Sequence, residues 1–121
     1  MLKECVLMLI DDQIDDVHTL SYYFRRYGVE KIEYATNAVK GLELLRGMSA
    51  KPFMILVDYF LIPDGGHSFI KEAMKVAPFQ NIRYELMTGR DLDDLQNVIA
   101  LHKGAADLDL EVRKFIKGYL I

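Results

Sequence analysis

The sequence predicts a doubly wound α/β fold, in which helices cover both faces of a five-stranded parallel sheet. Short apolar runs alternate with longer amphipathic stretches along the 121 residues, which is the pattern of repeated βαβ units. The apolar runs are rich in Val, Ile, Leu and Met, as expected for strands that are covered on both faces. Hydrophobic residues make up 51% of the chain and charged residues 27%, which excludes a disordered tail or a disulfide scaffold.

Five runs are expected to form the strands, and they comprise residues 4–10, 31–35, 53–57, 83–87 and 105–110. The first four are short, mostly apolar and bounded by charged or turn-forming residues. The fifth differs, because Asp107 and Asp109 alternate with Leu108 and Leu110. That alternation is typical of a half-exposed edge strand.

The expected helices comprise residues 14–27, 38–45, 69–77, 91–102 and 112–120. Gly28 ends the first helix, and Asn37 can cap the second. Pro78 disfavours helical geometry in the residue before it, so the third helix is expected to end near residue 77. Gly104 is the expected terminator of the fourth, and Gly118 weakens the fifth.

Charge and cysteine content narrow the function classes. The net charge of −3 gives no global attraction to nucleic acid or anionic lipid. The single Cys5 cannot form an intramolecular disulfide, and no apolar run is long enough to span a bilayer. We therefore expect a cytoplasmic protein in which residues 1–121 form one domain, with no linker and no separate output domain.

Acidic residues follow two of the predicted strands. Asp11 and Asp12 follow the first strand, Asp58 follows the third, and Thr88 with Gly89 follows the fourth. A doubly wound sheet brings these carboxyl ends to one edge, where ligands bind. Three carboxylates at one edge would repel one another unless a cation neutralised them, and oxygen ligands suit Mg²⁺. The alternative is that each aspartate only ends a strand or caps a helix, which is common for a single residue.

The loop after the first strand argues against a nucleotide cofactor. A dinucleotide- or flavin-binding domain would hold phosphate on the backbone N–H groups of a loop rich in Gly, Ser or Thr. Here residues 11–16 include four aspartates, which would repel a phosphate that no metal accompanies.

Taken together, residues 6–12, 55–58, 63–66, 86–91 and 104–107 resemble the receiver domain of bacterial two-component response regulators. The resemblance implies a CheY-like, flavodoxin-like (βα)5 three-layer sandwich with strand order 2-1-3-4-5. It implies that Asp58 accepts a phosphoryl group from a phosphohistidine, and that Thr88 hydrogen-bonds the phosphoryl oxygen. Asp11, Asp12, Asp58 and the backbone carbonyl of Phe60 would hold Mg²⁺. Such a phosphoprotein is a switch in a phosphorelay rather than a turnover enzyme.

The sequence departs from the receiver pattern near its end. The family usually has a lysine and a proline seven and eight positions after a Gly-Ala glycine; counted from Gly104, these positions hold Glu111 and Val112. Leu108 stands where the family often has an aromatic switch residue. We therefore expect an atypical receiver in which Arg90 supplies part of the missing positive charge. Arg90 and Phe60 would flank the mouth of the pocket.

Two functions are compatible with this sequence. The chain is either a receiver phosphorylated on Asp58 or a pseudo-receiver that acts through protein contact without phosphorylation. A haloacid-dehalogenase-type phosphatase is disfavoured, because Phe60 replaces its second aspartate.

The expected partners are a sensor histidine kinase or a histidine phosphotransfer protein, which would meet the first helix and the loop after the fifth strand. A downstream protein would bind the face of the fourth helix, fifth strand and fifth helix, for which the candidate residues are Ala100, His102, Lys103, Leu108, Arg113 and Lys117. Nothing in the sequence selects a monomer or a dimer.

Overall fold

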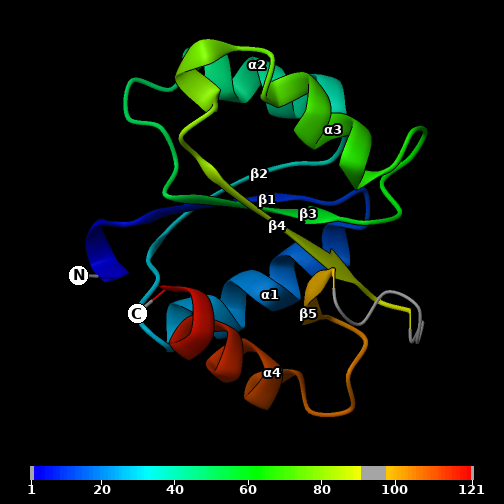
Figure 1. The fold of residues 1–121 in the computed structure, drawn as a ribbon. Helices are drawn as coiled ribbons and strands as arrows, with labels where there is room; N and C mark the ends of the chain where they lie inside the picture. The colour runs from blue at the N-terminus through cyan, green and yellow to red at the C-terminus, as the bar shows by residue number, and fades with distance from the viewer. Residues whose placement is uncertain (1, 91–97, 121) are drawn as a thin grey trace.

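Five parallel strands form a single sheet in the computed structural model, which describes residues 2–90 and 98–120. The strand order is β2-β1-β3-β4-β5, as the resemblance implied. The strands are β1 Val6–Ile10, β2 Lys31–Ala35, β3 Met54–Asp58, β4 Arg83–Thr88 and β5 Ile99–His102. This order places the carboxyl ends of β1 and β3 side by side at the centre of the sheet (Figure 1).

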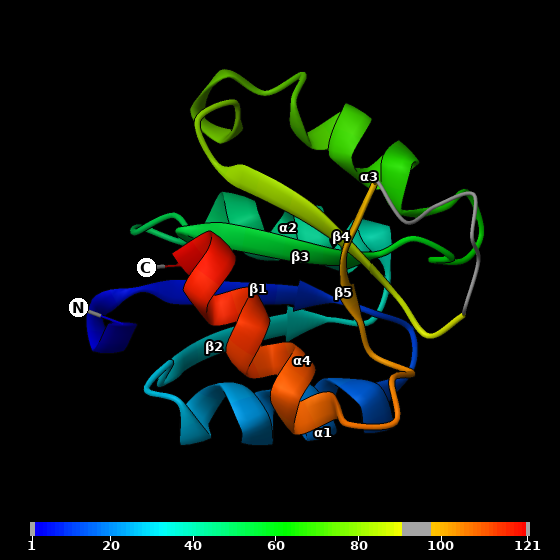
Figure 2. The ribbon, with the colours of Figure 1, turned by 60° about the horizontal axis from the view of Figure 1, so that its bottom comes forward.

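Helices cover both faces of the sheet, which confirms the predicted three-layer fold. One face carries α1 and α4, and the other carries α2 and α3 (Figure 1). A second view shows α4 in front of the sheet, with its first turns beside α1 (Figure 2). The helices are α1 Ile14–Arg26, α2 Ala38–Gly47, α3 Gly66–Ala73 and α4 Leu108–Phe115, the last continuing as a π-helical segment, Ile116–Leu120; short 3₁₀ turns lie at Leu2–Glu4 and Ala77–Phe79.

Two apolar cores lie on opposite sides of the sheet. Leu7 and Leu9 of β1 face the α1–α4 side, where Phe24 and Phe115 meet edge to face at 5.8 Å. Met8 of the same strand is fully buried on the α2–α3 side. Alternate residues of one strand thus enter different cores, which explains why the central strands are apolar throughout.

The early helices follow their local signals. α1 begins at Ile14 as predicted, and the Asn37 side chain accepts a hydrogen bond from the Lys40 N–H at 2.8 Å, so it caps α2. α3 ends at Ala73, before the predicted limit at residue 77. Pro78 lies instead in the 3₁₀ turn that leads into β4.

The prediction for the region after β4 is wrong. β5 spans Ile99–His102, within the segment predicted as the fourth helix; residues 91–97 of that segment lie outside the described residues. Ile99 and Leu101 are buried, and the residue after each is half-buried. This alternation is typical of a strand, but it rests on only two buried residues.

The segment predicted as the fifth strand contains the beginning of α4. The Asp107 side chain accepts a hydrogen bond from the Leu110 N–H at 3.0 Å, and Asp109 lies in the first helical turn. The alternating aspartates are therefore an N-cap and a first-turn acid rather than edge-strand residues.

Within the described residues, no helix combines the length and the apolar character needed to cross a membrane.

Candidate functional site

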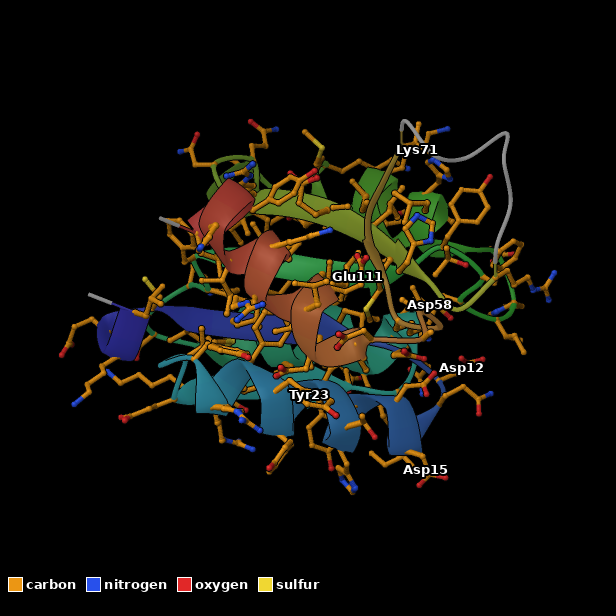
Figure 3. All side chains as sticks on the ribbon, turned by 90° about the horizontal axis from the view of Figure 1, so that it is seen from below. Asp12, Asp15, Tyr23, Asp58, Lys71 and Glu111 are labelled. Carbon is orange, nitrogen blue, oxygen red and sulfur yellow. The ribbon has the colours of Figure 1, made fainter. Side chains whose placement is uncertain are left out.

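Three carboxylates meet at the carboxyl edge of the sheet. Asp58 is the last residue of β3, and Asp11 and Asp12 directly follow β1, which pairs with β3. One oxygen from each side chain lies within 4.8 Å of the others, and Figure 3 shows Asp12 and Asp58 beside one another. Asp11 is fully buried, Asp58 is 5% exposed, and Asp12 is half-buried. These oxygen donors suit a divalent ion such as Mg²⁺.

The Lys103 ammonium contacts two members of this cluster, Asp11 and Asp58. Lys103 directly follows β5, and its backbone N–H donates to the Thr88 carbonyl at 2.9 Å. Its Nζ lies 2.5 Å from Asp11 Oδ2, 3.0 Å from Asp16 Oδ2 and 3.6 Å from Asp58 Oδ1. The Lys103 side chain is only 5% exposed. The prediction that Lys103 lies on the face that binds a downstream protein is therefore wrong.

The prediction that Glu111 occupies the lysine position is not supported. Glu111 lies in the first turn of α4 (Figure 3), and its N–H donates to the Asp107 carbonyl. Leu108, the predicted switch position, is the first residue of α4 rather than part of a strand. The lysine position cannot be counted from Gly104, because β5 precedes this glycine instead of following it.

The signal that was missed was a lysine directly after an apolar alternation. If the receiver pattern is counted from Lys103, the place of its aromatic residue, three positions before the lysine, falls on Ala100, in β5. The residue after Lys103 is Gly104, where the same pattern has a proline.

Two contacts join Thr88, Arg90 and Phe60 beyond the ends of β3 and β4. Thr88 ends β4, is 1% exposed, and its Oγ1 accepts a hydrogen bond from the Arg90 N–H at 3.1 Å. The Arg90 guanidinium lies 4.0 Å from the centre of the Phe60 ring. This stacked pair makes a cation–π contact, whereas the cation in contact with the carboxylates is Lys103.

Burial and charge shift the pKa values of the cluster. Burial raises the pKa of the Asp11 and Asp58 carboxyl groups, and Lys103 only partly offsets this. Burial also acts to lower the pKa of Lys103, but its hydrogen bond to Asp11 and the other nearby carboxylates outweigh burial and raise it. Burial is the largest cause for both carboxyl groups, and the one ammonium that several carboxylates share does not offset it. A divalent cation would supply the positive charge that is missing.

Two glycines allow the close approaches that form the site. A Cβ on Gly66, the first residue of α3, would lie 2.5 Å from the Asp58 carbonyl oxygen. A Cβ on Gly104 would lie 2.3 Å from the carbonyl oxygen of Gly89, in the loop after β4. Neither distance is tolerated between heavy atoms that are not bonded. Gly104 thus lets the loop that carries Lys103 contact the loop that follows Thr88.

A stability measurement tests the charge imbalance. At pH 7 without divalent cations, we expect Asp58→Asn to raise the free energy of unfolding by about 1 kcal/mol, because it removes a buried, repelled charge. The folded-state pKa of Asp58 is raised, so the cost of its charge is complete above that pKa and disappears as the pH falls through it. The advantage of the variant should therefore shrink towards about pH 4, near the ordinary aspartate pKa.

Urea unfolding of both proteins across this pH range measures the difference. Asp64→Asn, at an exposed position in the loop after β3, removes the same charge away from the cluster and is expected to have little effect. Equal effects of the two substitutions at pH 7 would contradict the interpretation.

Known proteins resemble this chain in sequence and in fold. No family model matches the chain. The chain is 31% identical over 88 residues to a sensor histidine kinase, CheAY, from Helicobacter pylori. This match covers 73% of the chain but only 11% of the kinase, so the chain spans about a tenth of that relative.

Solved structures of receiver domains share the fold. The signal receiver domain of a DNA-binding response regulator from Colwellia psychrerythraea superposes with a TM-score of 0.73 at 22% identity, over 97% of this chain and 98% of that one. The chemotaxis response regulator CheY4 of Vibrio cholerae superposes with a TM-score of 0.76 at 15% identity, over 94% and 97%. With its five-stranded parallel sheet and its aspartate cluster, the chain has the CheY-like fold of a response regulator receiver domain.

Proposed function

We propose that this chain is a two-component receiver that accepts a phosphoryl group on Asp58 and signals by protein contact. The surroundings of the Asp58 carboxylate support this proposal most strongly. This carboxylate lies within 4.8 Å of the carboxylates of Asp11 and Asp12, and 3.6 Å from the Lys103 ammonium. Aspartates that only end strands or cap helices have no need to be buried together at one edge, because burying like charges side by side costs free energy.

The proposed reaction is an in-line transfer. An Asp58 carboxylate oxygen attacks phosphorus and forms a P–O bond, while the P–N bond to the donor imidazole breaks. The electron pair of that bond returns to the imidazole nitrogen, and the other ring nitrogen of the donor already carries a proton, so the products are an acyl phosphate and a neutral imidazole. Catalysis of such a transfer depends mainly on positioning and electrostatics.

Residues of this chain would provide both. Asp11, Asp12, Asp58 and the Phe60 carbonyl are the proposed ligands of Mg²⁺, which supplies charge compensation for the phosphoryl oxygens. The Lys103 ammonium lies 3.6 Å from Asp58 and is close enough to reach a phosphoryl oxygen on that residue. Thr88 has a rotatable hydroxyl at the end of β4 and would donate to another phosphoryl oxygen.

The phosphoryl donor would be a phosphohistidine on a sensor kinase or phosphotransfer protein. The similarity to a stretch of a histidine kinase supports a kinase partner. The output surface would include the exposed side chains of Arg113 and Lys117 and the half-buried His102. Lys103 does not belong to that surface, because its side chain is buried in the site.

Intact-mass spectrometry tests the proposal. Wild-type protein incubated with Mg²⁺ and a small phosphodonor such as acetyl phosphate should gain one phosphoryl mass. The gain should be absent without Mg²⁺ and in Asp58→Asn, and present in the control Asp64→Asn. A wild type that stays unmodified, with phosphohistidine donors also tried, would favour the pseudo-receiver that acts without phosphorylation.

A further inference from the structure

The Lys103 ammonium has a partner outside the aspartate cluster. A primary ammonium carries three N–H donors. Two are used in hydrogen bonds to Asp11 Oδ2 at 2.5 Å and to Asp16 Oδ2 at 3.0 Å. The nearest Asp58 oxygen is farther away, at 3.6 Å. The ammonium is therefore held more closely by Asp11 and Asp16 than by Asp58.

Asp16 differs from the other acids of the site in its position. It lies in the first turn of α1, and its side chain is 45% exposed, whereas the side chain of Asp11 is fully buried. Its contact with Lys103 thus connects the outer surface of α1 to the buried ammonium. Asp15, the preceding residue of the same turn, is exposed and lies away from the cluster (Figure 3).

We propose that Asp16 is a positioning residue that holds Lys103 in the unphosphorylated state and releases it when a phosphoryl group occupies Asp58. This inference rests on the proposed function. A phosphoryl oxygen is a strong hydrogen-bond acceptor for an ammonium. To reach it, the Lys103 ammonium must move from Asp11 and Asp16 towards Asp58. Release leaves the Asp16 carboxylate unpaired on α1, so the surface of this helix differs between the two states.

The proposal makes two demands on the energetics. Asp16 and Lys103 must interact favourably when no phosphoryl group is bound. Asp16 must also compete with the phosphoryl group for the ammonium, so removing its charge must favour phosphoryl binding beyond the effect of net charge alone.

The first demand is tested by a double-mutant cycle in thermal unfolding, without divalent cations or phosphodonor. Asp16→Asn should be more favourable, or less damaging, in Lys103→Met than in wild type, by about 2 °C or more in Tm. Asp15→Asn removes the same charge from the same turn and should change Tm equally in both backgrounds. Equal shifts for Asp16→Asn in the two backgrounds would overturn the resting contact.

The second demand is tested with Mg²⁺ and beryllofluoride, an analogue of the phosphoryl group, titrated by calorimetry. Asp16→Asn should bind the analogue about threefold more tightly than Asp15→Asn, and this difference should vanish when each is combined with Lys103→Met. Identical affinities of the two single variants would overturn the release step, because a residue that only stabilises the helix end would give that result.

Failure of the proposed function is distinguishable from failure of this inference. Wild-type protein that binds no beryllofluoride overturns the proposed function and the release step together. The unfolding cycle still decides whether Asp16 holds Lys103, because it uses no phosphoryl group.

Discussion

Replacing Lys103 by methionine is expected to lower the free energy of unfolding by about 3 kcal/mol at pH 7 in the absence of divalent cations. The ammonium is 5% exposed and faces carboxylates of three aspartates, two of them buried. Its loss leaves these carboxylates without compensation, and breaking a buried ion pair by removing one partner costs about 3–5 kcal/mol. The partial exposure of Asp16 places the expected cost at the low end of that range.

The same substitution should respond to Mg²⁺. If the cost arises from uncompensated negative charge, saturating Mg²⁺ should recover a large part of it in Lys103→Met. Urea unfolding with and without Mg²⁺ measures both values. Lys114→Met, at an exposed position in α4, is the matched control and should change the free energy by less than about 0.5 kcal/mol. A Lys103→Met protein as stable as the control would show that the ammonium is not needed to offset these charges.

Gly104→Ala is expected to disturb both stability and the site. The new Cβ would lie 2.3 Å from the Gly89 carbonyl oxygen and 3.3 Å from its Cα, so the two loops must separate. Backbone shifts forced by such overpacking cost about 1–3 kcal/mol. Because Lys103 precedes Gly104, the shift would also move the ammonium relative to Asp11. We expect a lower Tm and slower phosphoryl acceptance by Asp58.

Gly47→Ala is the control for this substitution. Gly47 ends α2, and an added Cβ there meets nothing within 4 Å, so alanine should be neutral or slightly stabilising. Thermal unfolding and the rate of the phosphoryl mass gain measure the two effects. Gly104→Ala with the stability and rate of Gly47→Ala would contradict the close contact between the two loops.

The first four strands could be predicted from the sequence because each is signalled locally. β2 matches its predicted limits, Lys31–Ala35, and β1 and β3 differ from theirs only at the ends. The acidic cluster was predictable for a related reason: aspartates that directly follow parallel strands must meet at one edge of the sheet. Asp11, Asp12 and Asp58 meet there.

The last strand and its lysine could not be assigned in the same way. β5 is only four residues long, and Ile99 also fits the helical spacing of the leucines before it. With β5 misplaced, Lys103 falls in the turn after a predicted helix, on the face predicted for a downstream protein, and the count from Gly104 assigns the lysine position to Glu111. The role of Lys103 depends on contacts with Asp11 and Asp16, far away in the sequence, and no local pattern encodes them.

The position of the phosphoryl group on the chain decides whether Asp58 is the acceptor. Wild-type protein is incubated with Mg²⁺ and acetyl phosphate, the acyl phosphate is reduced with borohydride, and peptides are sequenced by mass spectrometry. Reduction converts a phosphorylated aspartate to homoserine, so we expect homoserine at position 58 and aspartate at positions 11, 12 and 16. Homoserine at another position, or none in protein that folds and binds Mg²⁺, would contradict this expectation.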